Sequence, residues 1–373
     1  MTLWFIIMWM VIFLLGISVV YLSVKIPQLL KSGTKTKKGK LKRFGIGLCV
    51  VMGFMGIMSH QIDLINAAVC ILYLAMIWAV SDMLFWILKK VFHRSFKRYY
   101  AGWIAIVLTS LALGAGWYLN HYVALTHYEL TTQKDVPALK IAMIADVHLG
   151  TTFNAEKFAR HLRKIQKQNP DIVVVVGDYV DDDTKKGEMI RASFSLGRMK
   201  TKYGVYFVLG NHDKGYYAAK RRGFSKQELI DTLKQNGVHV LQDETVLVAD
   251  SFYIVGRRDF SETKERHKRR KKMTDLVESL DRNKYIIVLD HQPADFENQA
   301  AAKVDLVLSG HTHGGQLFPF NQVGKWIGAN DFIYGHERRD DTDFIVTSGI
   351  SSWAIKFKTG TKSEFVIMDI KGK

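Results

Sequence analysis

Long apolar runs fill the first third of the chain. Four of them have membrane length or nearly so, and they cover residues 3–24, 44–58, 64–88 and 102–119. A helix needs about 20 apolar residues to cross the hydrocarbon core of a bilayer. We therefore predict an all-α transmembrane bundle of about four helices over residues 1–122, whose count depends most on the short second run. Asp82 lies inside the third run, and we expect it to reach the membrane interface or to pair with Lys89 or Lys90.

The pattern changes from residue 123 to the end of the chain at 373. Five short, mostly apolar and β-branched runs have strand length, and they cover residues 139–145, 172–177, 205–210, 285–290 and 304–310. Runs of this kind are typical of strands that are buried on both faces. Three stretches between them read as helices, at 155–168, 225–235 and 263–280, and two further strands are expected at 343–348 and 364–370. Alternating strands and helices favour a layered α/β domain over residues 123–373.

The net charge of +17 divides unevenly between these two parts. Residues 1–122 hold 13 Lys and Arg against two acidic residues, a net charge of +11, whereas the larger remainder carries only +6. The basic residues of the first part gather in the loops that flank the apolar runs, so a nucleic-acid partner is not needed to explain the charge. We expect no specific nucleic acid among the partners.

The same loops predict an orientation in the membrane. Segments 25–43 and 89–98 are strongly basic and carry no acidic residue, while the short link at 60–63 carries no Lys or Arg. Because positive loops stay in the cytoplasm, we predict a multi-pass protein of the cell membrane whose domain after residue 122 lies outside the cytoplasm. Both cysteines, Cys49 and Cys70, fall in the apolar part. The second part therefore has neither disulfides nor a thiolate metal site.

Residue types that bind metals follow each of the five predicted strands. They are Asp146, His148, Asp178, Asn211, His291, His311 and His313. Ligands collect at the carboxyl ends of strands in layered α/β domains, so we expect these side chains to converge, although any one of them alone reads equally well as a hydrogen-bonded polar residue. Residues i and i+2 of a strand point the same way, which predicts that Asp146 and His148 face one centre and that His311 and His313 do the same. Glycines before Asp178, Asn211 and His311 permit sharp turns.

The ligand types suit a particular chemistry. A phosphate ester resists hydrolysis because an anionic nucleophile must approach an anionic centre, and two metal ions about 3.5–4 Å apart remove that obstacle. Imidazole, carboxylate and amide ligands without thiolate suit Mn, Fe, Zn or Ni. The sequence therefore predicts two divalent or trivalent metal ions as cofactors.

These motifs resemble the calcineurin-like metallophosphoesterase superfamily, whose pattern is Asp-x-His, Gly-Asp, Gly-Asn-His-Asp, an isolated His and Gly-His-x-His. Every element occurs in order between residues 141 and 316. The resemblance implies a β-sandwich flanked by helices on both sides and hydrolysis by attack of a metal-bound hydroxide. It also implies a role for each residue: Asp146, His148 and His313 on one metal, Asn211, His291 and His311 on the other, Asp178 between them, His212 as the acid for the leaving group, and Asp213 orienting His212.

Longer strings narrow the resemblance. Residues 310–316 (GHTHGGQ) and 289–293 (LDHQP) are similar to a membrane-associated branch that includes transmembrane metallophosphoesterases and UDP-diacylglucosamine hydrolases. We therefore expect a phosphoesterase or phosphodiesterase that acts on a phosphorylated small molecule, lipid or envelope polymer outside the cytoplasm. Two alternatives stay open: a cytoplasm-facing hydrolase of a nucleotide or nucleotide-linked lipid, and a membrane protein that binds a phosphate ligand without turnover.

Overall fold

The computed structural model describes residues 2–30, 36–93, 99–215, 221–264 and 270–372. The chain forms two compact units, the first made of Met1–Ala115 with Ala354–Lys356 and the second of Gly116–Trp353 with Phe357–Lys373.

Long apolar helices make up most of the first unit. They are α1 (Thr2–Lys25), α2 (Lys37–Ile62), α3 (Leu64–Val91) and α4 (Tyr100–His121), and the short 3₁₀ helix η1 (Ile26–Leu30) follows α1. All four are long and apolar enough to cross a membrane, as the four apolar runs predicted. Helix α2 has 26 residues because the Thr36 hydroxyl accepts a hydrogen bond from the Gly39 amide and so starts the helix before the apolar run.

The partner expected for Asp82 was wrong. Its carboxylate pairs with Lys25 (2.6 Å), from the end of α1, and accepts hydrogen bonds from the hydroxyls of Tyr21 and Tyr99 (2.7 and 2.6 Å). Lys89 and Lys90 lie two turns further along the same helix, and side chains of one helix meet only at spacings of three or four residues. The ion pair therefore forms with a residue of another helix.

Two six-stranded sheets form the centre of the second unit. The first has the order β1 (Val123–Thr131), β12 (Ser363–Lys371), β2 (Leu139–Ile144), β3 (Ile172–Val176), β4 (Val205–Val208), β5 (His239–Leu241). The second has the order β10 (Gly335–Arg339), β11 (Thr342–Val346), β9 (Leu306–Ser309), β8 (Tyr285–Leu289), β7 (Phe252–Gly256), β6 (Glu244–Val248). Neighbours from β2 to β5 and from β7 through β8 and β9 to β11 run parallel.

Alternating side chains explain why these strands are apolar at nearly every position. Ile141 and Met143 of β2 pack between the two sheets, together with Ile287 and Leu289 of β8. The intervening residues of β2 point to the outer face of the first sheet, and those of β8 to the outer face of the second. Each sheet is thus covered on both faces.

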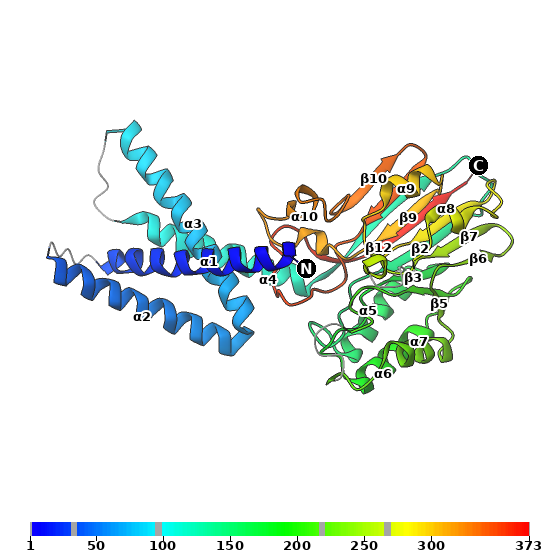
Figure 1. Cartoon of the computed structure of the whole chain (residues 1–373), viewed down its shortest axis with the longest axis horizontal. Helices are drawn as coiled ribbons and strands as arrows, with labels where there is room; N and C mark the ends of the chain where they lie inside the picture. Colours follow the sequence, from blue (N-terminus) through cyan, green and yellow to red (C-terminus); the bar gives the residue numbers. More distant parts are fainter. Residues whose placement is uncertain (1, 31–35, 94–98, 216–220, 265–269, 373) are drawn as a thin grey trace. The chain divides into compact units, whose positions relative to one another are not determined.

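Helices cover the two outer faces. Helices α5 (Ala155–Gln166), α6 (Lys186–Gly197) and α7 (Lys226–Gln235) pack on the first sheet, and α8 (Met273–Val277) and α9 (Phe296–Ala301) pack on the second. Figure 1 shows these two sets on opposite sides of the paired sheets. The predicted β-sandwich flanked by helices is confirmed.

The sequence prediction and the structure differ in two segments. The helix expected at 263–280 is much shorter in the described residues. The 3₁₀ helix η3 (Phe260–Lys264) ends at Lys264, and only α8 (Met273–Val277) forms within the described part of the predicted range, after the Lys271 amide has donated a hydrogen bond to Asp243. Residues 265–269 lie outside the described residues. The segment after residue 122 also forms a strand, β1, which pairs with β12 along its whole length.

Candidate metal centre

The predicted ligands lie where parallel strands end. Asp146, Asp178 and Asn211 follow β2, β3 and β4, and His291 and His311 follow β8 and β9. The backbone continues the β2–β3 register past the strand ends, because the Asp146 amide donates to Gly177 and the His148 amide to Asp178. Both sheets therefore deliver their polar residues to one edge of the sandwich.

The side chains form two groups with metal-ligand spacing. Asp146, His148 and His313 make one group and Asp178, His291 and His311 the other, with ligand atoms within 4.8 Å of one another in each. The expectation that His311 and His313 share a centre was wrong. Both residues have positive φ (71° and 49°) and lie beyond β9, His313 in the 3₁₀ helix η4 (His313–Gly315), so the strand period does not apply to them.

Asp178 lies between the two groups. Its Oδ2 is 3.1 Å from Nε2 of His291 and 3.8 Å from Nε2 of His148. Burial alone would raise the pKa of Asp178, but the neighbouring imidazoles of His291 and His212 outweigh burial and hold the pKa well below its usual range. A buried carboxylate that stays ionised between two groups of imidazoles is the expected form of a bridging ligand.

The orientation of the imidazoles fits a pair of metal ions. Nδ1 of His148 lies 3.1 Å from the Asp181 carboxylate and Nδ1 of His291 lies 2.8 Å from the Val176 carbonyl. These oxygens only accept hydrogen bonds, so Nδ1 carries a proton in each ring, and Nε2 is the atom that is left to bind an ion. Both Nε2 atoms are buried and neither makes a hydrogen bond of good geometry among the described residues, although that of His291 lies 3.1 Å from the Asp178 carboxylate. A buried orphan of this kind is costly unless an ion binds it.

Asn211 is held in place by Gln292 and Asp259, for which the sequence predicted no role. The Gln292 amide lies 3.4 Å from Asn211 Oδ1 and donates to both oxygens of Asp259 (2.9 and 3.0 Å). Asp259 is buried and follows β7 at the same edge of the second sheet. The sequence analysis did not predict strand β7. Had it done so, Asp259 would have been grouped with the other acidic residues that follow strands.

The acid beside His212 is Asp181. Its Oδ1 lies 3.3 Å from Nδ1 of His212. The carboxylate of Asp213, which was expected to orient His212, accepts hydrogen bonds from the backbone amides of Tyr179, Val180 and Gly210 instead (2.9, 3.0 and 2.7 Å). The structure therefore corrects this expectation: Asp213 braces the turn between two ligand loops, and Asp181 contacts both His212 and His148.

The same carboxylates set the charge of His212. Burial alone would lower the pKa of this imidazole, but Asp178 and Asp181 outweigh it and raise the pKa to about 9. His212 is therefore protonated at neutral pH and carries a proton that it can give away.

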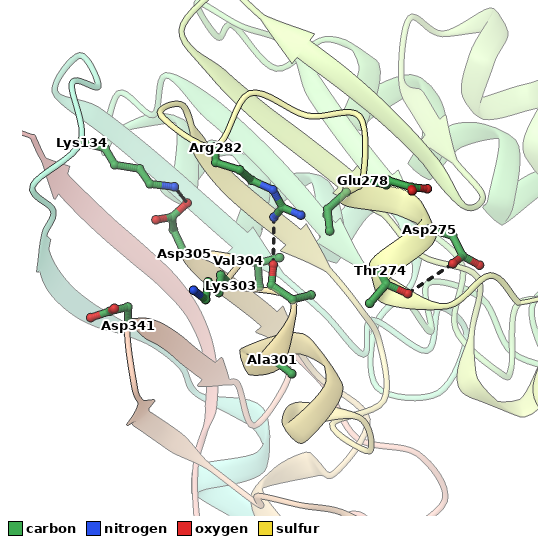
Figure 2. A pocket seen from close by; sticks show the side chains of 12 residues that line it. Lys134, Thr274, Asp275, Glu278, Arg282, Ala301, Lys303, Val304, Asp305 and Asp341 are labelled. Carbon is green, nitrogen blue, oxygen red and sulfur yellow. Dashed lines mark hydrogen bonds and ion pairs between the residues drawn. The ribbon is translucent and has the colours of Figure 1, made fainter.

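A large cavity lies away from this centre. It has a volume of about 700 Å³ and is lined by Lys134, Arg282 and Asp305, among others (Figure 2). Arg282 precedes β8 and Asp305 precedes β9, so the cavity opens at the amino ends of the strands, opposite the edge that carries the ligands. Two of its charges are already satisfied, since Lys134 pairs with Asp305 (2.7 Å) and Arg282 donates to the Ala302 carbonyl (2.9 Å).

Known proteins match a large part of this chain. A family model described as calcineurin-like phosphoesterase matches residues 139–315. An uncharacterized metallophosphoesterase of Aquifex aeolicus is 30% identical over 271 residues, which cover 71% of this chain and 98% of the relative. The chain belongs to the calcineurin-like metallophosphoesterase family.

In two further relatives, the region that aligns with this chain is only part of the protein. The uncharacterized metallophosphoesterase Cj0846 of Campylobacter jejuni is 32% identical over 237 residues, covering 63% of this chain and 60% of the relative. A Danio rerio relative named transmembrane protein with metallophosphoesterase domain is 31% identical over 245 residues, covering 62% of this chain and 53% of the relative. This chain thus spans little more than half of each of these two proteins.

Proposed function

We propose that the chain is a membrane-anchored, two-metal phosphoesterase that hydrolyses a phosphoester or phosphodiester bond at the edge of its β-sandwich. One observation carries the proposal: two groups of buried ligands meet at Asp178, and the buried Nε2 atoms of His148 and His291 lie 3.8 and 3.1 Å from its Oδ2. Asp146, His148 and His313 would hold one ion. Asn211, His291 and His311 would hold the other, with Asp178 bridging.

The two ions, when bound, would acidify a water molecule and neutralise the charge of the phosphoryl group. The protein contributes by orienting the imidazoles that would bind the ions. Asp181, Val176 and Ser351 hold Nδ1 of three ligand imidazoles, at 3.1, 2.8 and 3.3 Å. Their Nε2 atoms are thereby fixed before any substrate arrives, which lowers the cost of assembling the site.

His212 supplies the proton for the leaving group in this proposal. Asp181 fixes the ring through Nδ1, and the raised pKa of about 9 keeps the imidazole protonated at neutral pH. Donation from Nε2 to the departing oxygen avoids the release of an unstable alkoxide.

The basic loops that follow the first and third apolar runs support a position of the second unit outside the cytoplasm. With four spans and both loops in the cytoplasm, the N-terminus and the second unit lie outside. The substrate class in this proposal is a phosphorylated lipid or envelope polymer.

A turnover assay tests the proposal. We expect the purified full chain in detergent to hydrolyse an aryl phosphodiester or an aryl phosphomonoester when Mn²⁺ is present and to stop when the metal is chelated. A chain that binds the metal and inorganic phosphate but turns over neither ester would contradict it, and would favour a phosphate-binding protein without catalysis.

A further inference from the structure

Four large apolar side chains are exposed on one short segment of the second unit. They belong to the segment 317–328, named here the aromatic loop, and their exposed fractions are 61% for Phe318, 56% for Phe320, 72% for Trp326 and 38% for Ile327. The segment contains the short helix α10 (Val323–Trp326). Exposed aromatic residues in a cluster mark a surface that another phase or molecule covers.

The aromatic loop adjoins the candidate metal centre. It begins two residues after η4, which carries His313. Trp353, also exposed, adjoins the centre as well, with its ring 5.0 Å from that of His212. A molecule that touches this surface is therefore beside the imidazole that we propose as the proton donor.

The loop is also bonded to the end of α4 within the second unit. The Gly116 carbonyl of α4 accepts a hydrogen bond from the Lys358 amide (2.9 Å), and the next amide, that of Thr359, donates to Gln316 (2.9 Å). The Thr359 hydroxyl accepts from the Phe318 amide (3.0 Å). Three consecutive contacts thus join the last turns of α4 to the first residues of the aromatic loop.

The last turns of α4 have the composition of a membrane interface. Helix α4 is long and apolar enough to cross a membrane, and it ends at His121. Trp117, Tyr118 and Tyr122 are exposed around this end. Tyr and Trp are enriched where a span leaves the hydrocarbon core, because their rings suit the headgroup layer.

We propose that the aromatic loop rests in the headgroup layer of the bilayer, and that the substrate is a membrane lipid whose phosphoester reaches the metal centre from that layer. The lipid-substrate part rests on the proposed hydrolase function, whereas the position of the loop does not. The lipid surface is preferred over a second copy of the chain because the loop is fixed to the end of a candidate span that itself carries interfacial aromatic residues.

A depth measurement tests the position of the loop. The chain has two cysteines, so replacing Cys49 and Cys70 with alanine gives a background in which Phe320→Cys carries a single spin label. Phe194→Cys is the control, because Phe194 is 51% exposed on α6, on the helical face of the first sheet. Retained metal-dependent turnover of an aryl phosphodiester shows that each labelled chain is folded.

In nanodiscs of phosphatidylethanolamine and phosphatidylglycerol, we expect the ratio of oxygen to nickel-chelate accessibility to be at least threefold higher at position 320 than at position 194. Equal, water-like accessibility at both positions would overturn the proposal. A label at position 320 could instead be protected from both oxygen and the nickel chelate and show dipolar broadening from a label on another chain. That result would overturn the proposal and indicate that a second copy of the chain covers the aromatic loop.

A comparison of substrates tests the lipid part separately. Replacing both Phe320 and Trp326 with serine should lower kcat/KM for phosphatidic acid or phosphatidylglycerol in nanodiscs at least tenfold more than for a soluble aryl phosphodiester. Phe194→Ser should leave that ratio unchanged. Turnover of the soluble ester without turnover of either lipid would overturn the lipid substrate while leaving the hydrolase proposal intact, and loss of turnover on all substrates would contradict the hydrolase itself.

Discussion

Asp178 is the residue at which the two ligand groups meet. Asp178→Asn replaces a bridging carboxylate with a neutral amide, so we expect it to lower the occupancy of both metal positions and to abolish turnover, because the two ions then repel each other without compensation. Elemental analysis of the purified variant measures this. Asp183→Asn, an exposed acid of the same loop, is the matched control and should bind two ions. Full activity of Asp178→Asn with two bound ions would remove Asp178 from the bridging role.

His212 is expected to matter most when the leaving group is poor. His212→Ala should lower the rate on alkyl esters by roughly 10²–10⁴, because proton donation to the departing oxygen is lost. The loss should be much smaller for nitrophenyl esters, whose leaving group departs without a proton. An equal loss for both classes of ester at unchanged metal content would show that His212 is not the acid.

Asp181 sets the pH range over which His212 stays protonated. In the proposed function, activity with poor leaving groups needs the protonated imidazole, and we expect it to fall as the pH rises through the pKa of His212. The Asp181 carboxylate, 3.3 Å away, helps to raise that pKa to about 9. Asp181→Asn removes this charge and should move the alkaline limb of the pH–rate profile to lower pH by about one unit.

The profile should be recorded at saturating metal, since Asp181 also holds His148 and its loss should weaken metal affinity by roughly 10–100-fold. An alkaline limb that stays in place, or moves to higher pH, would contradict this account.

At the scale of the elements, the loops that follow β3 and β4 approach each other so closely that only glycine fits. A Cβ on Gly210 would lie 2.2 Å from Oδ1 of Asp178 and 2.4 Å from its backbone nitrogen. Gly210→Ala must therefore push these loops apart, and we expect weaker binding of both ions by at least tenfold and a stability loss of about 2–4 kcal/mol.

Gly187→Ala in α6 is the matched control, because the nearest atom to its Cβ is 3.6 Å away on the Arg191 side chain. It should leave metal content unchanged and stabilise the helix slightly, because Gly187 lies in its first turn. Metal analysis and thermal unfolding of both variants decide the matter, and a Gly210→Ala chain with two tightly bound ions would show that the loops tolerate the separation.

The arrangement of the strands explains what the sequence could predict. Apolar runs such as 139–145 and 172–177 are recognisable because they are buried on both faces, and parallel pairing brings the residues after them to one edge. Strand β1 escaped prediction because it lies at an edge of the sheet and, unlike the buried strands, has no continuous apolar run. Strand β7 was missed as well, and Asp259 with it.

The directions of the site side chains were harder to predict. Asp146, His148 and His311 all have positive φ, at 55°, 41° and 71°. In such turns the side chain follows the local backbone and not the alternation of a strand. The prediction that Asp213, and not Asp181, contacts His212 failed for the same reason. Both acids lie in turns whose backbone course depends on contacts distant in the sequence.

At the scale of the whole molecule, the orientation in the membrane decides which substrates are within reach. Thirteen Lys and Arg residues fall in two loops that hold no acid, whereas the link at 60–63 holds no Lys or Arg. We expect alkaline phosphatase fused after Lys373 to be active and a fused green fluorescent protein to be dark. The same pair of reporters placed in segment 25–43 is the control and should give the reverse. Fluorescence without phosphatase activity at the C-terminus would place the catalytic unit in the cytoplasm and favour a nucleotide-linked substrate.

Catalysis in the proposed function depends on two ions held around Asp178. The most direct measurement titrates Mn²⁺ into the purified, chelator-stripped full chain while bound metal and turnover of an aryl phosphodiester are recorded together. We predict no turnover without metal and a steep rise as occupancy passes from one ion to two per chain. Full turnover in the stripped chain, or two bound ions without turnover, would contradict the account.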